Sequence, residues 1–196
     1  MASGELRALV LAGGKSQRMG TDKGDLIYYK EPQKIHVAKQ LQNLGLETFI
    51  SLRKDQKQEK GYSYIMDSHK EMGPLTGLIS AFTMHKCAWL CVGCDYPFLQ
   101  GLHLQKLLKA RKKSMFATVF QDKNTGFLIP TLAIYEAAFF EVLEENIAKD
   151  QFSLLQMLKT NPCNIISVNG KAFKSVDTQQ DYERIIRKLD FPQGNR

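Results

Sequence analysis

Residues 7–14 have the sequence RALVLAGG, and this stretch decides the fold class. The apolar run at 7–12 predicts a short buried strand, and Gly13-Gly14 predicts a turn directly after it. Residues 32–44 carry apolar side chains at helical spacing, and Gly45 is suited to end a helix. The chain therefore begins as a strand, a glycine turn and a helix.

The same alternation continues through the middle of the chain. Strands are predicted at 47–52, 62–66 and 88–93, and helices from Pro74 to about His85 and over 100–112. Strands that alternate with helices predict a parallel sheet with helices on both faces.

The second half of the chain has a different pattern. Residues 115–121 and 127–130 flank the turn-forming segment 122–126, which predicts a local antiparallel hairpin. Helices are predicted near 136–146 and 153–159, a strand at 163–168, and a last helix with Asp177 as its N-cap and Gln180 completing a capping box. We expect one domain, residues 1–196, with a three-layer Rossmann-like α/β sandwich around a mostly parallel, twisted sheet.

Charge and composition limit the possible partners. The chain has 196 residues, with 27 basic and 20 acidic residues and a net charge of +7, which favours anionic partners. The basic residues are spread along the chain, so we expect no nucleic-acid partner. No apolar run is long enough to span a membrane, and the N-terminus lacks the pattern of a secretion signal. We expect a cytoplasmic protein with no membrane association.

The segment after the first strand has the chemistry of a triphosphate loop. Gly13 and Gly14 let backbone N–H groups approach phosphate oxygens, and Lys15, Arg18 and Lys23 bring three cations to the same segment. The spacing fits neither of the two common phosphate-loop patterns, G-x-x-x-x-G-K-[ST] and G-x-G-x-x-G. A basic surface loop is the alternative interpretation.

Residues 11–23, LAGGKSQRMGTDK, resemble the signature L-A-G-G-x-S-x-R-M-G-x-D-K of molybdenum cofactor guanylyltransferases. The resemblance implies that GTP contacts the backbone of four consecutive residues, Leu11, Ala12, Gly13 and Gly14. It also implies that Arg18 and Lys23 hold the phosphates. The related cytidylyl-transferring enzymes usually have L-A-A-G here, so Gly13 favours guanine.

Two later segments match the same family. Asp67 lies shortly before Gly73-Pro74-Leu75-Thr76-Gly77, and the resemblance implies that Asp67 contacts the nucleotide. Residues 94–99, CDYPFL, resemble the family's C-D-x-P-x-L and place Asp95 at the end of a predicted strand. A carboxylate at that edge is suited to Mg²⁺, which prefers oxygen ligands. Alternatively, both aspartates only form turns.

Two further segments depart from the family pattern. Residues 175–181, SVDTQQD, replace the usual N-x-N-T-P-E-D, so Asp177 either supplies a second metal oxygen or caps the last helix. Ile129 stands before Pro130, where a polar residue is common in the family. This departure bears on the contacts made to the cofactor that accepts the nucleotide.

Cys87, Cys91 and Cys94 offer a different function. Their C-x-x-x-C-x-x-C spacing is that of the iron–sulfur motif in radical S-adenosylmethionine enzymes. The three thiols would have to converge in a loop, yet they lie along the predicted strand at 88–93. Alternation along a strand places Cys87 and Cys91 on one face and Cys94 on the other. Burial as small apolar residues is therefore the better interpretation.

The resemblance implies a magnesium-dependent nucleotidyltransferase that moves GMP from GTP to molybdopterin and releases pyrophosphate. Arg18, Lys23 and Asp95 are the expected catalytic residues, with Asp95 as the metal ligand. Molybdopterin cytidylyltransferase and sugar-phosphate nucleotidyltransferase remain alternatives of the same fold. We expect a monomer that hands its product to other cofactor-synthesis proteins or to molybdoenzyme chaperones.

Overall fold

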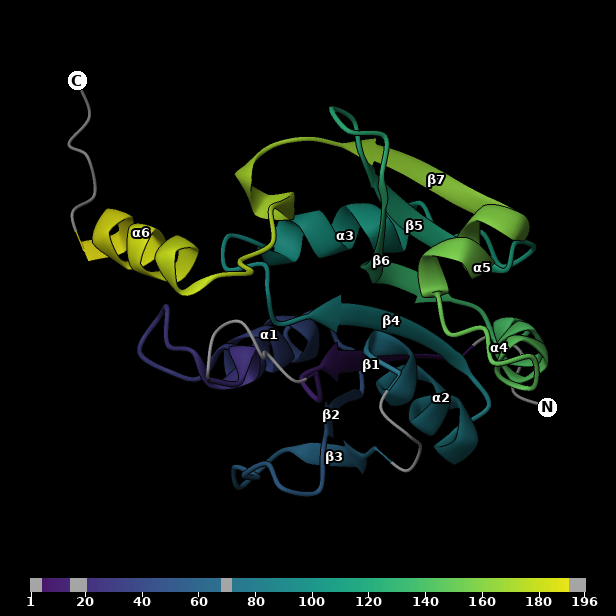
Figure 1. The fold of residues 1–196 in the computed structure, drawn as a ribbon, viewed down its shortest axis with the longest axis horizontal. Coiled ribbons are helices and arrows are strands. Elements are labelled where there is room, and N and C mark those ends of the chain that lie inside the picture. Colours follow the sequence, from purple (N-terminus) through teal and green to yellow (C-terminus); the bar gives the residue numbers. More distant parts are fainter. Residues whose placement is uncertain (1–4, 15–20, 68–71, 191–196) are drawn as a thin grey trace.

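A computed structural model describes residues 5–14, 21–67 and 72–190, which are built around a seven-stranded sheet (Figure 1). The strands are β1 (Leu6–Leu11), β2 (Thr48–Leu52), β3 (Ser63–Met66), β4 (Ala88–Gly93), β5 (Ala117–Asp122), β6 (Leu128–Tyr135) and β7 (Cys163–Val168). Their order across the sheet is β3-β2-β1-β4-β6-β5-β7. Neighbouring strands are parallel except where β6 pairs with β4 and with β5.

Helices cover both faces of this sheet. They are α1 (Gln33–Gln42), α2 (Pro74–Met84), α3 (Gly101–Lys109), α4 (Phe139–Ile147), α5 (Leu154–Thr160) and α6 (Gln179–Asp190), with short 3-10 turns η1 (Lys23–Asp25) and η2 (Lys171–Phe173). Apolar residues of α1 and α3 pack in the core on one face, and those of α2, α4 and α5 pack on the other. The expected three-layer α/β sandwich is confirmed.

Side-chain alternation along the inner strands explains the two cores. On β1, Ala8 and Val10 face the core shared with α1 and α3, while Leu9 faces the core shared with α2. On β4, Leu90 and Trp89 divide in the same way, and both are fully buried. A strand buried on both faces has a continuous apolar sequence, as the runs at 7–12 and 88–93 do.

The predicted antiparallel hairpin exists as β5 and β6, and it is part of the sheet. β6 lies between β4 and β5, and it continues past Pro130 to Tyr135. Pairing of β6 with β4 begins at Leu132, so the missing N–H of Pro130 is not needed by that neighbour. The following helix starts at Phe139, later than the predicted residue 136.

The start of α6 differs from the prediction. Thr178 is the residue before the helix, and its Oγ1 accepts the N–H of Asp181 at 3.2 Å and donates to the Asp181 carboxylate at 2.7 Å. Thr178, and not Asp177, therefore caps the first turn. The apolar side of α6 packs on a small separate cluster around Leu26 and Tyr28, at the end of the molecule shown on the left of Figure 1.

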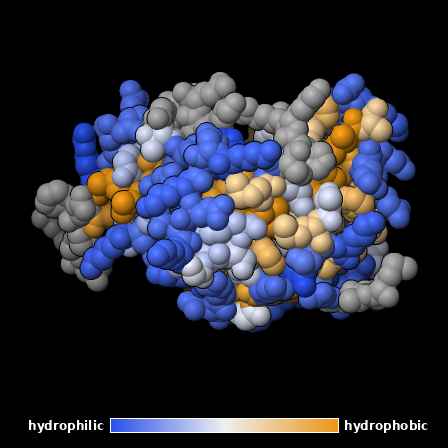
Figure 2. Space-filling model, turned by 90° about the horizontal axis from the view of Figure 1, so that it is seen from below, coloured by the Kyte–Doolittle hydropathy of each residue, from blue (hydrophilic) through white to orange (hydrophobic). Residues whose placement is uncertain are grey.

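The surface is mostly polar on the face in Figure 2, where apolar residues form small separate groups. Most large apolar side chains are instead buried in the two cores beside the sheet. Within the described ranges, no helix is both long and apolar enough to cross a membrane.

Candidate functional site

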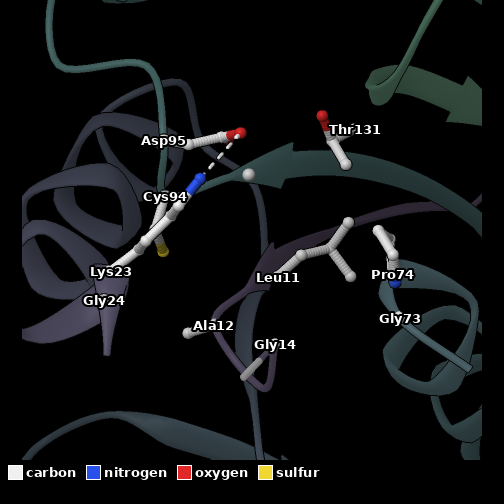
Figure 3. A pocket seen from close by; sticks show the side chains of 11 residues that line it. Leu11, Ala12, Gly14, Lys23, Gly24, Gly73, Pro74, Cys94, Asp95 and Thr131 are labelled. Atoms are coloured by element: carbon white, nitrogen blue, oxygen red, sulfur yellow. Dashed lines mark ion pairs between the residues drawn. The ribbon is translucent and has the colours of Figure 1, made fainter. Parts of the chain in front are cut away.

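A pocket of about 290 Å³ opens where β1 and β4 end (Figure 3). Its lining comes from five places in the sequence: the end of β1, the η1 turn, the start of α2, the end of β4 and the beginning of β6. The residues are Leu11, Ala12, Gly14, Lys23, Gly24, Gly73, Pro74, Gly93, Cys94, Asp95 and Thr131.

The sheet topology explains why the pocket lies there. From β1 the chain moves outward through β2 to β3, and it then returns to place β4 on the opposite side of β1. Ligands in open α/β sheets bind outside the carboxyl ends of the strands at such a reversal of direction. The parallel strands β1, β2, β3 and β4 all end at this edge, so residues that follow them are brought together.

Lys23 lies between two carboxylates that are distant in sequence. Its Nζ donates to Asp177 Oδ1 at 2.6 Å and lies 4.0 Å from Asp95 Oδ2. Figure 3 shows the Lys23 side chain pointing at Asp95 across the mouth of the pocket. Ser175 Oγ donates to the other oxygen of Asp177 at 2.7 Å. The last described loop before α6 thus contributes a carboxylate to this site.

Asp95 is partly buried, with 21% of its side chain exposed. Its Oδ1 would be 2.6 Å from a Cβ on Gly93, so the carboxylate lies directly over that glycine, where any larger residue would displace it. Burial raises the pKa of Asp95 to about 6, while the nearby Lys23 cation acts in the opposite direction. A partly buried carboxylate that lines the pocket at a strand end is well placed to bind a cation.

Asp67 lies beneath the glycine turn. Ser51 Oγ donates to Asp67 Oδ1 at 2.6 Å, and the carboxylate packs against the Cα of Gly13. A Cβ on Gly13 would overlap the Asp67 carboxylate, so this close approach requires glycine. In the nucleotide-free chain, a Cβ at residue 13 would therefore first meet Asp67.

Gly13→Ala is expected to weaken nucleotide binding by displacing Asp67 from Ser51. Isothermal titration calorimetry with Mg-GTP should show a dissociation constant raised on the order of tenfold, as expected when one hydrogen-bonded polar contact is lost. Gly101→Ala is the matched control, because a Cβ there meets nothing within 4 Å and Gly101 does not line the pocket. A Gly13→Ala chain that binds as tightly as the wild type would contradict this account of the packing.

Thr131 is a pocket residue that sequence reasoning missed. It follows Pro130, shares a hydrogen bond of 2.9 Å with Tyr96, and lies against Gly93. Ile129, which drew attention because it departs from the family pattern, is buried in the core. Alternation could not have found it, because the register of β6 against β5 is irregular between Leu128 and Ala133, and Ile129 packs in the same core as Leu132.

The three neighbouring cysteines do not form a metal centre. Cys87 and Cys91 are buried in the core next to α2, whereas Cys94 is buried in the opposite core, as alternation predicted. Burial raises the pKa of both the Cys91 and Cys94 thiols. Over the described ranges, no group of three or more cysteine, histidine or acidic side chains could hold a metal ion. The iron–sulfur alternative is therefore wrong.

Most of the expected site residues do meet. Leu11, Ala12, Gly14, Lys23 and Asp95 line one pocket, and Gly13 with Asp67 lies directly beside it. Lys15 and Arg18 lie outside the described residues.

Comparisons with known proteins identify the family of this chain. A family model for the "MobA-like NTP transferase domain" matches residues 8–162. Molybdenum cofactor guanylyltransferase of Pseudomonas putida is 30% identical, over 76% of this chain and 80% of its own length. The molybdenum cofactor biosynthesis bifunctional protein of Synechocystis sp. is 23% identical over 92% of this chain, which spans only 53% of that protein.

Among solved structures, the fold resembles molybdopterin-guanine dinucleotide biosynthesis protein A from Archaeoglobus fulgidus. The TM-score is 0.75 at 20% sequence identity, and the match covers 94% of this chain and 98% of that one. This likeness extends the shared fold beyond the segment that the family model matches.

Proposed function

The chain belongs to the MobA-like NTP transferase domain family of nucleotidyltransferases, and on that premise we propose that it transfers GMP from GTP to molybdopterin with release of pyrophosphate. The observation that carries the proposal is the meeting of Lys23 and Asp95 beside the glycine turn, at the carboxyl ends of β1 and β4. This combination offers backbone donors, a cation and a carboxylate to one bound triphosphate.

Two carboxylates fit a magnesium ion. Asp95 and Asp177 both approach the Lys23 ammonium, so the two negative charges are directed at the position of one cation. Oxygen ligands from one or two carboxylates, completed by phosphate oxygens, suit Mg²⁺. We propose that Asp95 and Asp177 hold the metal, which when bound would neutralise charge on the phosphate oxygens of the nucleotide.

The chain's own residues act by positioning and by neutralising charge. The terminal phosphate of molybdopterin is already an anionic nucleophile, so its attack on the α-phosphorus of GTP needs no protein base. We propose that Lys23 leaves Asp177 to bind the phosphates and to stabilise the pyrophosphate as the bond to the α-phosphorus breaks. The N-terminus of α2 at Gly73-Pro74 lines the same pocket, and its helix dipole favours an anion there.

Calorimetry with the four nucleoside triphosphates tests the base assignment. We expect GTP to bind with a lower dissociation constant than CTP, ATP or UTP, each with Mg²⁺. The reason is the double glycine at 13–14, which the resemblance associates with guanine. Equal binding of all four, or a preference for CTP, would remove the guanylyl assignment. Formation of the dinucleotide from GTP and molybdopterin then tests the acceptor directly.

A further inference from the structure

Polar contacts behind the glycine turn point to a role for the segment that follows β2. We propose that Arg53 and Gln56 are positioning residues that orient the backbone donors of the glycine turn and fix the start of the segment that carries Lys23. This inference rests on the proposed use of that turn to bind a triphosphate. Neither side chain lines the pocket, so both would act through the residues they hold.

Arg53 joins the two ends of the segment between β1 and η1. Its guanidinium donates from Nη1 to the carbonyl of Gly13 at 2.9 Å and from Nη2 to both carboxylate oxygens of Asp22 at 3.0 and 3.1 Å. The Arg53 and Asp22 side chains are only 17% and 23% exposed. Charge-assisted hydrogen bonds of a rigid guanidinium are among the strongest that a side chain makes, and a lysine cannot reproduce their geometry.

Gln56 makes the same connection with a neutral side chain. Its Nε2 donates to the carbonyl of Ala12 at 2.9 Å and to Asp22 Oδ2 at 3.1 Å. Its Oε1 accepts the backbone N–H of Arg53 at 2.8 Å, which fixes the orientation of the amide. Arg53 and Gln56 thus hold two consecutive carbonyls, and both hold Asp22.

The geometry of the peptide bond relates these carbonyl contacts to the direction of the neighbouring N–H groups. In a trans peptide the C=O and the next N–H point in opposite directions. Because the carbonyls of Ala12 and Gly13 point toward Gln56 and Arg53, the N–H groups of Gly13 and Gly14 point away from them. Gly14 lines the pocket, so these contacts set the direction of the N–H groups that a phosphate would meet.

The residues on both sides of Lys23 are held by side chains. Asp22 before it is held by Arg53 and Gln56, and Asp25 after it accepts from the buried Lys34 at 2.5 Å. Lys34 also donates to the carbonyl of Lys57 at 3.1 Å. The connection between β2 and β3 therefore holds Asp22 directly and Asp25 through Lys34. The backbone on both sides of Lys23 is therefore held in place.

Arg53→Gln tests the inference, with Arg111→Gln as the matched control. Arg111 binds the Glu136 carboxylate through two hydrogen bonds of 2.7 Å, and both side chains are more buried than those of Arg53 and Asp22. Neither Arg111 nor Glu136 lines the pocket. Breaking that pair should lower the melting temperature without changing nucleotide affinity, which separates loss of stability from loss of positioning.

We expect Arg53→Gln to raise the Mg-nucleotide dissociation constant at least about tenfold at a temperature where both variants are folded, because small displacements of positioning groups cost that much or more. Arg53→Lys should be intermediate, and adding Asp22→Asn to Arg53→Gln should cost little more. The nucleotide used in these titrations is the one of GTP, CTP, ATP and UTP that the wild-type chain binds most tightly. Affinity within twofold of the wild type, or an equal loss in Arg111→Gln, would overturn the proposal.

Amide hydrogen exchange of the nucleotide-free chain gives a second readout that does not depend on the proposed reaction. Exchange over residues 22–25 should be faster in Arg53→Gln and unchanged in Arg111→Gln. Unchanged exchange in Arg53→Gln would also overturn the positioning role. The two proposals can also fail separately. If the wild-type chain binds no guanine nucleotide, and exchange is faster in Arg53→Gln but not in Arg111→Gln, the guanylyl assignment is refuted and the positioning contacts are supported.

Discussion

Asp95→Asn is expected to abolish nucleotidyl transfer and, at the same time, to raise the melting temperature of the metal-free chain at pH 8. The amide keeps the shape over Gly93 but lacks the negative charge that a magnesium ion needs. Turnover should fall at least about 10³-fold, since loss of one preorganised electrostatic contact alone costs 10²–10³-fold. The gain in stability has a separate cause.

That cause is the burial of the carboxylate. The folded chain raises the pKa of Asp95 from 3.8 to about 6, so it binds this proton more tightly than the unfolded chain does. Above pH 6 the folded chain must keep a poorly hydrated charge, which costs on the order of 2–3 kcal/mol of folding free energy. The cost disappears below about pH 4, where both states are protonated. Asparagine never carries the charge and avoids the cost.

Thermal unfolding of both chains at pH 8 and pH 4, with a chelator present, measures this difference. We expect Asp95→Asn to melt several degrees higher at pH 8, on the basis of about 2–4 °C per kcal/mol for a chain of this size. The two chains should melt together at pH 4. A variant that is less stable than the wild type at pH 8 would show that Asp95 is held by favourable contacts and is not destabilised by burial.

The residues recognised from sequence alone share one property. Gly13 and Asp95 lie just after the ends of β1 and β4, and Lys23 belongs to the same local signature as Gly13, so a local pattern already indicates where each is placed. Parallel strands then bring their carboxyl ends to one edge without any further information. The fold class and the pocket could be predicted for this reason, because both depend on alternation of strands and helices.

Residues whose partners are distant in sequence could not be predicted in this way. Arg53 and Gln56 lie in a polar segment with no periodicity, and their contacts with Asp22 exist only after β2 has paired with β1. The place of β6 between β4 and β5 is a similar case, since strand propensity does not choose a neighbour. The sequence predicted Asp177 as the cap where the structure has Thr178, because both residue types favour that position.

Lys23→Ala is expected to slow transfer more than Asp177→Ala does, and the two changes should shift metal affinity in opposite directions. Lys23 supplies the cation that we place on the developing charge of pyrophosphate, and loss of such a contact costs on the order of 2–4 kcal/mol of barrier. In the nucleotide-free chain the same ammonium lies between the carboxylates of Asp177 and Asp95. Its removal leaves two negative charges close together, which should attract Mg²⁺ more strongly.

Asp177→Ala has the reverse effect on the metal, because it removes the Asp177 carboxylate from the site and leaves that of Asp95. Calorimetric titration of Mg²⁺ into the nucleotide-free variants should therefore rank affinity as Lys23→Ala above wild type, and wild type above Asp177→Ala. Thr178→Ala serves as the control for helix capping. It should lower stability by about 1 kcal/mol and leave metal affinity unchanged.

The combination of rate and affinity decides between two roles for Asp177. If its carboxylate holds the metal, Asp177→Ala loses metal affinity and activity while its melting temperature stays near that of the wild type, because Thr178 keeps the cap. If the carboxylate only neutralises Lys23 before the nucleotide arrives, Asp177→Ala frees that ammonium and should bind GTP at least as tightly as the wild type in the absence of metal. An Asp177→Ala chain that transfers more slowly than Lys23→Ala would reverse our ranking and make metal binding the larger electrostatic contribution.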